Sequence, residues 1–200
     1  MKIITLFITL FFVGISNKPS TLKDAERKYA LEQFENSKQK FLDELKGLTP
    51  EQLNFKAAPD KWSIAEVAEH ICLSETTLAG IATQNLKTTP DSSRRGEVKL
   101  SDTLLRQILA NRTGKAQAPE VIKPKGKFAT IQEAITYFNE ARNTNMQFLK
   151  TTQEDLRNRY WKHPLLGMLD LYQVYLLVSG HCERHTAQIV EVKQSVGYPK

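Results

Sequence analysis

Four long segments of this 200-residue chain repeat their apolar residues at every third or fourth position, the spacing of one face of an α-helix. They cover about residues 21–46, 63–85, 130–150 and 170–195. Strand-like alternation is scarce between them. Because a chain of this length forms one domain with a single core, these segments predict an all-α fold, an antiparallel four-helix bundle.

Local signals mark where these helices begin and end. Ser63 with Glu66, and Thr130 with Glu133, have the spacing of a capping box, which predicts a helix start at each place. Trp62, just before Ser63, is expected to pack against Val67 as a hydrophobic staple. Gly47 is expected to end the first helix. A short helical turn is predicted after Thr49, and a loop is predicted around Trp161, His163 and Gly167.

Residues 86–129, between the second and third helices, form an unusually long connection rich in Thr, Pro, Ser, Gly and Lys. A short amphipathic piece follows Ser101 inside it. We expect this crossover to carry the chain from one end of the bundle to the other.

The first 16 residues are predicted to be a secretory signal peptide, and residues 17–200 the bundle domain. A basic start at Lys2 precedes an apolar run from Ile3 to Ile15, and small residues stand at Gly14 and Ser16. The protein is therefore expected to be exported, to the periplasm or outside the cell. An uncleaved N-terminal anchor is the alternative, and only then would the protein contact a membrane.

Charge and cysteine content narrow the function further. The net charge of +6 equals the excess within residues 87–127, which hold ten basic and four acidic residues and almost no aromatic ones. Such a segment lacks the stacking platform of single-strand binders, so nucleic acid is not expected as a partner. Cys72 and Cys182 could form a disulfide in an exported protein. Cys72 lies two residues after His70, about 200° around the same predicted helix, so these two side chains should face different directions.

Three histidines are the candidate metal ligands. His181 and His185 lie one turn apart on the apolar face of the fourth helix, a spacing that lets two imidazoles bind one ion. His70 lies on the flank of the apolar face of the second helix and could join them if these helices pack together. Three imidazoles leave a coordination position open and suit one divalent transition metal, Zn or Ni first and Fe or Mn next. The alternative is that each histidine is an ordinary hydrogen-bonded core residue, as His163 beside Pro164 is expected to be structural.

Several motifs in sequence order resemble the DinB/YfiT-like metalloenzymes over about residues 29–192. They are Leu48–Leu53, Trp62–His70, Ala118–Pro119, Pro124–Phe128, His163–Gly167 and His181–Ile189. The resemblance implies a four-helix bundle with a long crossover between helices two and three, and metal ligands at His70, His181 and His185. Relatives of this kind include thiol-dependent transferases and an isomerase. Low-molecular-weight thiols are mostly cytoplasmic, so a thiol-transferase role disagrees with export.

Two functions follow as hypotheses: a metal-dependent hydrolase or transferase acting on an unknown small molecule, and a non-catalytic metal-binding or stress-response module. The carboxylates near the histidines in sequence are Glu66, Glu69, Glu75 and Glu183. None is assigned as a general base, and Glu66 is expected to be used by its helix cap. Arg184 and Gln188 are candidates for contacts to the ligands or the substrate. A homodimer is left open.

Overall fold

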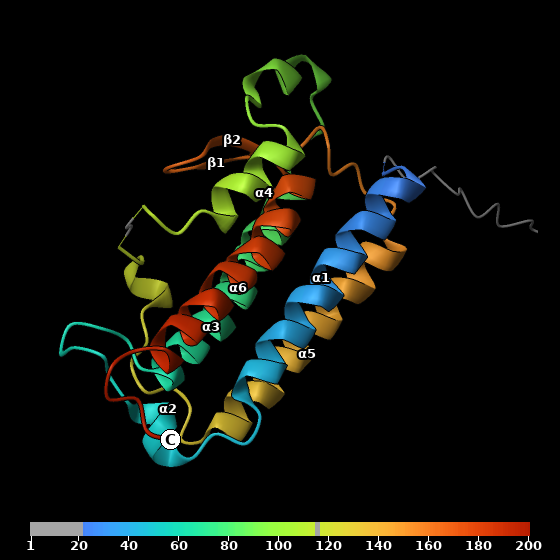
Figure 1. The fold of residues 1–200 in the computed structure, drawn as a ribbon. Helices are drawn as coiled ribbons and strands as arrows, with labels where there is room; N and C mark the ends of the chain where they lie inside the picture. Colours follow the sequence, from blue (N-terminus) through green and yellow to red (C-terminus); the bar gives the residue numbers. More distant parts are fainter. Residues whose placement is uncertain (1–21, 115–116) are drawn as a thin grey trace, which may run out of the picture.

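Four long helices form a bundle in the computed structural model, which describes residues 22–114 and 117–200 (Figure 1). They are α1 (Asp24–Leu45), α3 (Ile64–Asn85), α5 (Ile131–Thr151) and α6 (Leu171–Lys193). The all-α four-helix prediction is confirmed. The predicted signal peptide lies outside the described residues.

Short elements occupy the connections. They are α2 (Pro50–Asn54), the 3₁₀ helices η1 (Ser92–Glu97) and η2 (Glu120–Ile122), α4 (Asp102–Ala110), and the strands β1 (Tyr160–His163) and β2 (Gly167–Asp170). The strands pair antiparallel, with Tyr160 opposite Asp170 and His163 opposite Gly167. The prediction of an irregular loop here was wrong. Strands of four residues are too short to show alternation, and Gly167 supplies the positive φ of 77° at the turn.

The long crossover determines how the helices run. It returns the chain to the end of the bundle where α3 starts, so α5 runs parallel to α3, and α6 then runs back (Figure 1). Each long helix has two long neighbours: α1 and α3 both pack against α5 and α6. The pairs α3/α6 and α1/α5 are the antiparallel ones. Because α3 and α6 run in opposite directions, the second turn of α3 lies against the middle turns of α6.

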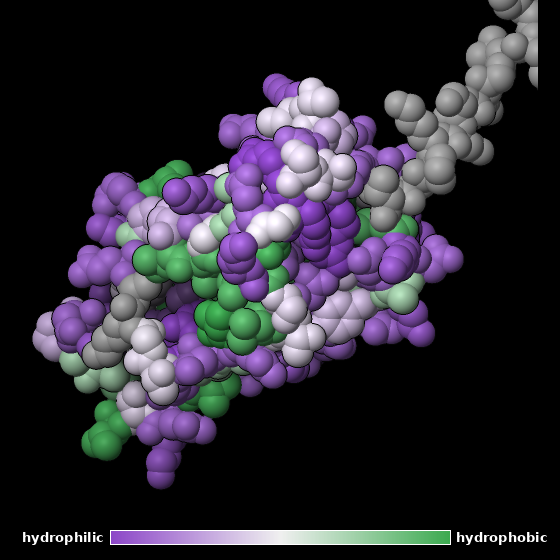
Figure 2. Space-filling view, turned by 90° about the horizontal axis from the view of Figure 1, so that it is seen from above, coloured by the Kyte–Doolittle hydropathy of each residue, from purple (hydrophilic) through white to green (hydrophobic). Residues whose placement is uncertain are grey.

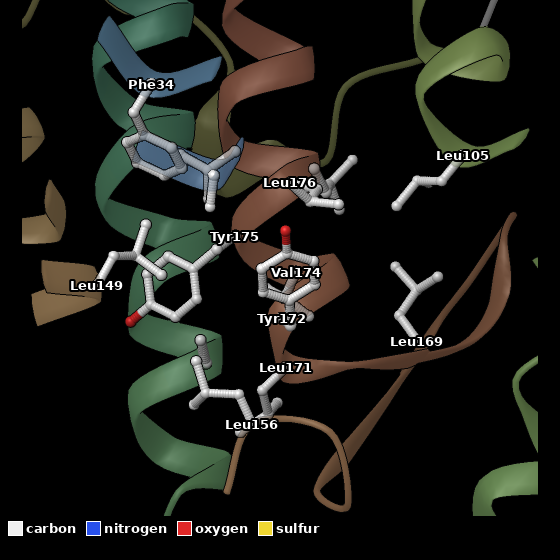
Figure 3. Close-up of a cluster of buried hydrophobic side chains, with 14 of the residues drawn as sticks. Phe34, Leu105, Leu149, Leu156, Leu169, Leu171, Tyr172, Val174, Tyr175 and Leu176 are labelled. Carbon is white, nitrogen blue, oxygen red and sulfur yellow. The ribbon is translucent and has the colours of Figure 1, made fainter. Parts of the chain in front are cut away.

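Helix α6 lies at the centre of the packing, with α1, α3 and α4 around it. Its first half contributes Tyr172, Tyr175 and Leu176 to an apolar cluster with residues of α1 and α5 (Figure 3). A second apolar cluster at the other end includes Phe41, Phe138 and Ile189. Burial of these side chains, at about 25 cal/mol per Å² of apolar surface, is the main stabilising contribution.

A buried ion pair lies between the two clusters. The Arg142 guanidinium, 0% exposed, donates to both carboxylate oxygens of Glu75 at 2.9 and 2.7 Å. It also donates to the Phe34 carbonyl and the Ser37 hydroxyl, at 2.7 and 2.6 Å. The charge is therefore compensated and its donors are used, which a charge so deeply buried requires.

Gly180 lets α4 approach α6 closely. A Cβ at this position would lie 2.6 Å from Leu109 Cδ1 and 2.8 Å from the Arg106 guanidinium. Glycine costs about 1 kcal/mol inside a helix relative to alanine, and here it permits this contact one residue before His181.

The predicted helix caps are confirmed. Ser63 and Thr130 accept hydrogen bonds from the backbone N–H groups of Glu66 and Glu133. Across the described residues, no helix combines the length and apolar character needed to cross a bilayer. Figure 2 shows the molecule from above the view of Figure 1. This face is mostly hydrophilic, with an apolar area among the polar side chains.

Replacing Glu75 by glutamine should lower the free energy of unfolding by about 3 kcal/mol, because the Arg142 charge would stay buried without its counterion. Urea unfolding followed by circular dichroism measures this difference. Glu140→Gln, an exposed change on α5, is the control and should stay within about 0.5 kcal/mol of wild type. Equal stabilities for both variants would contradict the assignment.

Candidate metal centre

The antiparallel packing of α3 and α6 brings His70, His181 and His185 together. One ring nitrogen from each lies within 4.8 Å of the others. The centroid of the His70 ring lies 5.0 Å from that of His181 and 4.4 Å from that of His185. The centroids of the two rings on α6 lie 4.5 Å apart. His70 is buried, whereas the other two are partly exposed. The cluster therefore has a core side and a side that solvent reaches.

Hydrogen bonds to Nδ1 orient two of the three rings. His70 Nδ1 lies 2.8 Å from the carbonyl oxygen of Ile122 in η2, and His185 Nδ1 lies 2.8 Å from Gln188 Oε1. Because a carbonyl can only accept, His70 carries its proton on Nδ1, and the amide oxygen of Gln188 assigns the same form to His185. Both Nε2 atoms therefore present a lone pair.

These lone pairs give a direct test of whether a cation fits. The Nε2 atoms of His70 and His185 lie 3.2 Å apart, a separation at which two acceptors repel unless a proton or cation lies near both. His181 Nδ1 is buried and has no hydrogen-bond partner among the residues that the structure describes. A cluster of imidazole acceptors, buried on its core side, is the donor set of a transition-metal site, so the residues fit such an ion.

Burial keeps the three imidazoles neutral. Desolvation lowers the pKa of His70, and it lowers the pKa of His181 still further, with His185 and His70 adding to the effect. The pKa of His185 is lowered to about 3, first by burial and then by the nearby His70. A neutral imidazole is the form that binds a metal.

Trp62 forms a wall of the site that sequence reasoning missed. Its ring lies 4.8 Å from that of His70 and 6.5 Å from that of His185, centroid to centroid. The sequence predicted Trp62 only as a hydrophobic staple for the helix that starts after Ser63. It does pack against the apolar cluster that contains Val67. Trp62 therefore contacts both this cluster and the histidine rings.

All four carboxylates considered from the sequence are engaged elsewhere. Glu66 accepts from the backbone N–H of Ser63, as predicted, and from Lys56, while Glu75 is paired with Arg142. Glu69 accepts from the backbone N–H groups of two residues in the crossover. Glu183 binds Lys40 and Arg106. Each is therefore a structural group in this conformation.

The two polar residues singled out on α6 have different roles. Gln188 contacts the ligand set directly through His185. Arg184 instead donates to the backbone carbonyls of Leu109, Asn111 and Gly114, so it fastens the crossover to α6.

The remaining candidates lie outside the cluster. Cys72 and Cys182 are free and buried, so the alternative of a disulfide between them is not realised. The Cys72 thiol points to the Ala134 carbonyl on α5, away from His70 as expected, and burial raises the pKa of Cys182 to about 11. His163 accepts from two backbone N–H groups in the hairpin turn, a structural role as predicted.

The lowered histidine pKa values predict how the stability of the metal-free protein depends on pH. Histidines in an unfolded chain have a pKa near 6.5, whereas burial lowers the pKa of His185 in the folded protein to about 3. Between these values the unfolded chain binds more protons, so the free energy of unfolding is highest above about pH 6.5 and falls as the pH drops. Each such histidine contributes up to about 1.4 kcal/mol per pH unit.

Urea unfolding in the presence of a chelator, at about pH 7.5 and about pH 5.5, measures this dependence. His185→Asn should show a smaller decrease than wild type. A variant with the same pH dependence as wild type would contradict the assignment.

Comparison with known proteins supports the fold and assigns a family. YuaE, an uncharacterized protein of Bacillus subtilis (strain 168), is 24% identical over 163 residues, which cover 82% of this chain and 96% of YuaE. The structure of YfiT from Bacillus subtilis, described as a probable metal-dependent hydrolase with an unusual four-helix bundle topology, superposes with a TM-score of 0.60 at 16% identity. It covers 90% of this chain and 92% of YfiT. The DinB superfamily model matches residues 33–189, and the chain belongs to that superfamily.

Proposed function

We propose that His70, His181 and His185 together hold one divalent transition metal ion, and that the protein is a metal-dependent hydrolase of a small molecule. One observation carries this proposal: three neutral imidazoles offer ring nitrogens within 4.8 Å of one another, and one of their Nδ1 atoms is buried without a partner. Core histidines that served packing alone would have their ring nitrogens satisfied by the protein.

The ligand number favours catalysis over a closed structural site. Three protein ligands leave at least one coordination position, and the partial exposure of His181 and His185 gives it an outlet to solvent. Zn or Ni suits an all-imidazole set best and Fe also suits it, whereas Mn prefers oxygen ligands and is the least favoured of the four. A divalent ion held by these three imidazoles would lower the pKa of a water molecule toward neutrality and would polarise an oxygen of a substrate.

The chain's own groups set the geometry around this position. Ile122 and Gln188 hold the rings of His70 and His185 so that their Nε2 atoms face inward. Trp62 and the adjacent apolar cluster exclude water from the core side, so a substrate would reach the site from the partly exposed side. The description of YfiT favours hydrolysis over group transfer as the reaction.

A non-catalytic metal-binding module is the second candidate. It is favoured by the engagement of Glu66, Glu69, Glu75 and Glu183, which leaves none of these four carboxylates free to move a proton. Under this alternative the site would bind the ion tightly and turn over no substrate.

Elemental analysis of the purified protein tests the metal site. Wild type should hold close to one transition-metal ion per chain, and His181→Ala with His185→Ala should abolish binding. His163→Ala is the control, because this histidine lies outside the cluster, and it should retain the metal. Metal-free wild-type protein, or full retention by the double variant, would overturn the proposal.

Turnover separates the two candidates. A panel of esters, amides and activated thiol acceptors should reveal a substrate whose hydrolysis is lost on chelation and restored by adding back the ion. The His181→Ala variant should lose that activity and His163→Ala should keep it. Tight metal binding without turnover on any member of the panel would favour the binding module.

A further inference from the structure

Glu69 is the residue next to a proposed metal ligand, and its carboxylate faces the crossover. It is 5% exposed. Oε1 accepts from the backbone N–H of Lys125 at 2.7 Å, and Oε2 accepts from that of Gly126 at 3.0 Å. The two oxygens therefore bind two successive backbone N–H groups of one segment. Hydrogen bonds to a charged carboxylate are stronger than those between neutral groups.

The segment that Glu69 holds also carries the hydrogen-bond acceptor of His70. Ile122, three residues before Lys125, offers its carbonyl oxygen to His70 Nδ1 at 2.8 Å. The spacer between them is short and stiff. Lys123 is extended, with φ −69° and ψ 139°, as a residue before proline prefers, and Pro124 has a fixed φ.

Other groups hold the same segment in register. The Ile122 N–H donates to the Pro119 carbonyl at 3.0 Å, and the Ile122 side chain is 9% exposed. Gly126 has a φ of 73°, a conformation that glycine adopts without strain. The lysines nearby do not compete for Glu69, because Lys123 and Lys125 both pair with Glu120.

We propose that Glu69 is a positioning residue for the metal centre. By fastening residues 125–126 to α3, it fixes the Ile122 carbonyl and thereby the ring orientation and tautomer of His70. Two neighbouring side chains of α3 therefore bind the same crossover segment. Glu69 accepts from the backbone N–H groups of residues 125 and 126, and His70 donates to the carbonyl of Ile122. This inference rests on the proposed function for its effect on metal, but its effect on the His70 ring stands apart from any metal.

Glu69→Gln is the sharpest test. The glutamine has the same shape, but its amide N–H₂ would face one of the two backbone N–H groups, so one bond is lost and a donor meets a donor. The dissociation constant for Zn²⁺, measured by competition with a chelating dye, should rise by about 10- to 100-fold. Nitrogen-15 NMR of histidine-labelled, metal-free protein should show His70 as a single Nδ1–H tautomer in wild type and as a mixture in the variant.

Asp155→Asn is the matched control. Asp155 also accepts from two backbone N–H groups, those of Arg157 and Asn158, but in the loop before the hairpin, away from the histidine cluster. It should leave both the Zn²⁺ affinity and the His70 tautomer unchanged. Gly126→Ala, which forces an unfavourable φ with no atom within 4 Å of the new Cβ, should weaken Zn²⁺ binding in the same direction as Glu69→Gln.

The outcomes separate this inference from the proposed function. Unchanged affinity and tautomer in Glu69→Gln would overturn the positioning role, as would an equal loss of affinity in Asp155→Asn. Failure of wild type to bind Zn²⁺, with the His70 tautomer still disturbed in Glu69→Gln, would refute the metal site and uphold the positioning role.

Discussion

The antiparallel packing of α3 against α6 is the constraint on which the site depends. It sets the second turn of α3, with His70, opposite His181 and His185 in the middle turns of α6. The long crossover makes this pairing possible, because it returns the chain to the start of α3 and lets α6 run back after α5 (Figure 1). A slip of α3 by one turn, about 5.4 Å, would exceed the spread of the three ring nitrogens and separate the set.

The buried ion pair and the crossover keep that register in different ways. Glu75 lies on α3 one turn beyond Ile71 and binds Arg142 of α5 with both oxygens, which fixes α3 against the neighbour that runs parallel to it. The crossover is fastened to α6 by Arg184 and to α3 by Glu69. Charged groups therefore determine which surfaces meet, while the apolar clusters supply most of the stabilisation.

Periodicity was enough to predict the four helices and to place His181 and His185 on one helix face, because burial enforces these local spacings. The helix starts were predicted from capping-box spacing. His70 joined the set only on the condition that the second and fourth helices pack together, and through the family resemblance. The hairpin of β1 and β2 could not be predicted, since four-residue strands carry too little pattern. The partners of Glu69 and His70 are backbone groups of residues 122–126, more than 50 positions away, and backbone groups look alike in any sequence. Trp62 was predicted as a hydrophobic staple, and it does pack against the apolar cluster that contains Val67. Its contact with the His70 ring depends on tertiary packing, which the local sequence does not show.

The stability of the bundle does not require the histidine cluster. Two apolar clusters and a compensated ion pair hold the helices, so a metal here would not be the folding nucleus that it is in small zinc domains. The cluster instead costs stability: three desolvated imidazoles, two Nε2 atoms 3.2 Å apart and a buried Nδ1 without a partner replace apolar contacts that the core could have made. A local arrangement that opposes folding and is still held by ordered partners is typical of a functional site. That cost, more than the histidine spacing itself, supports a binding and catalytic role for this end of the bundle.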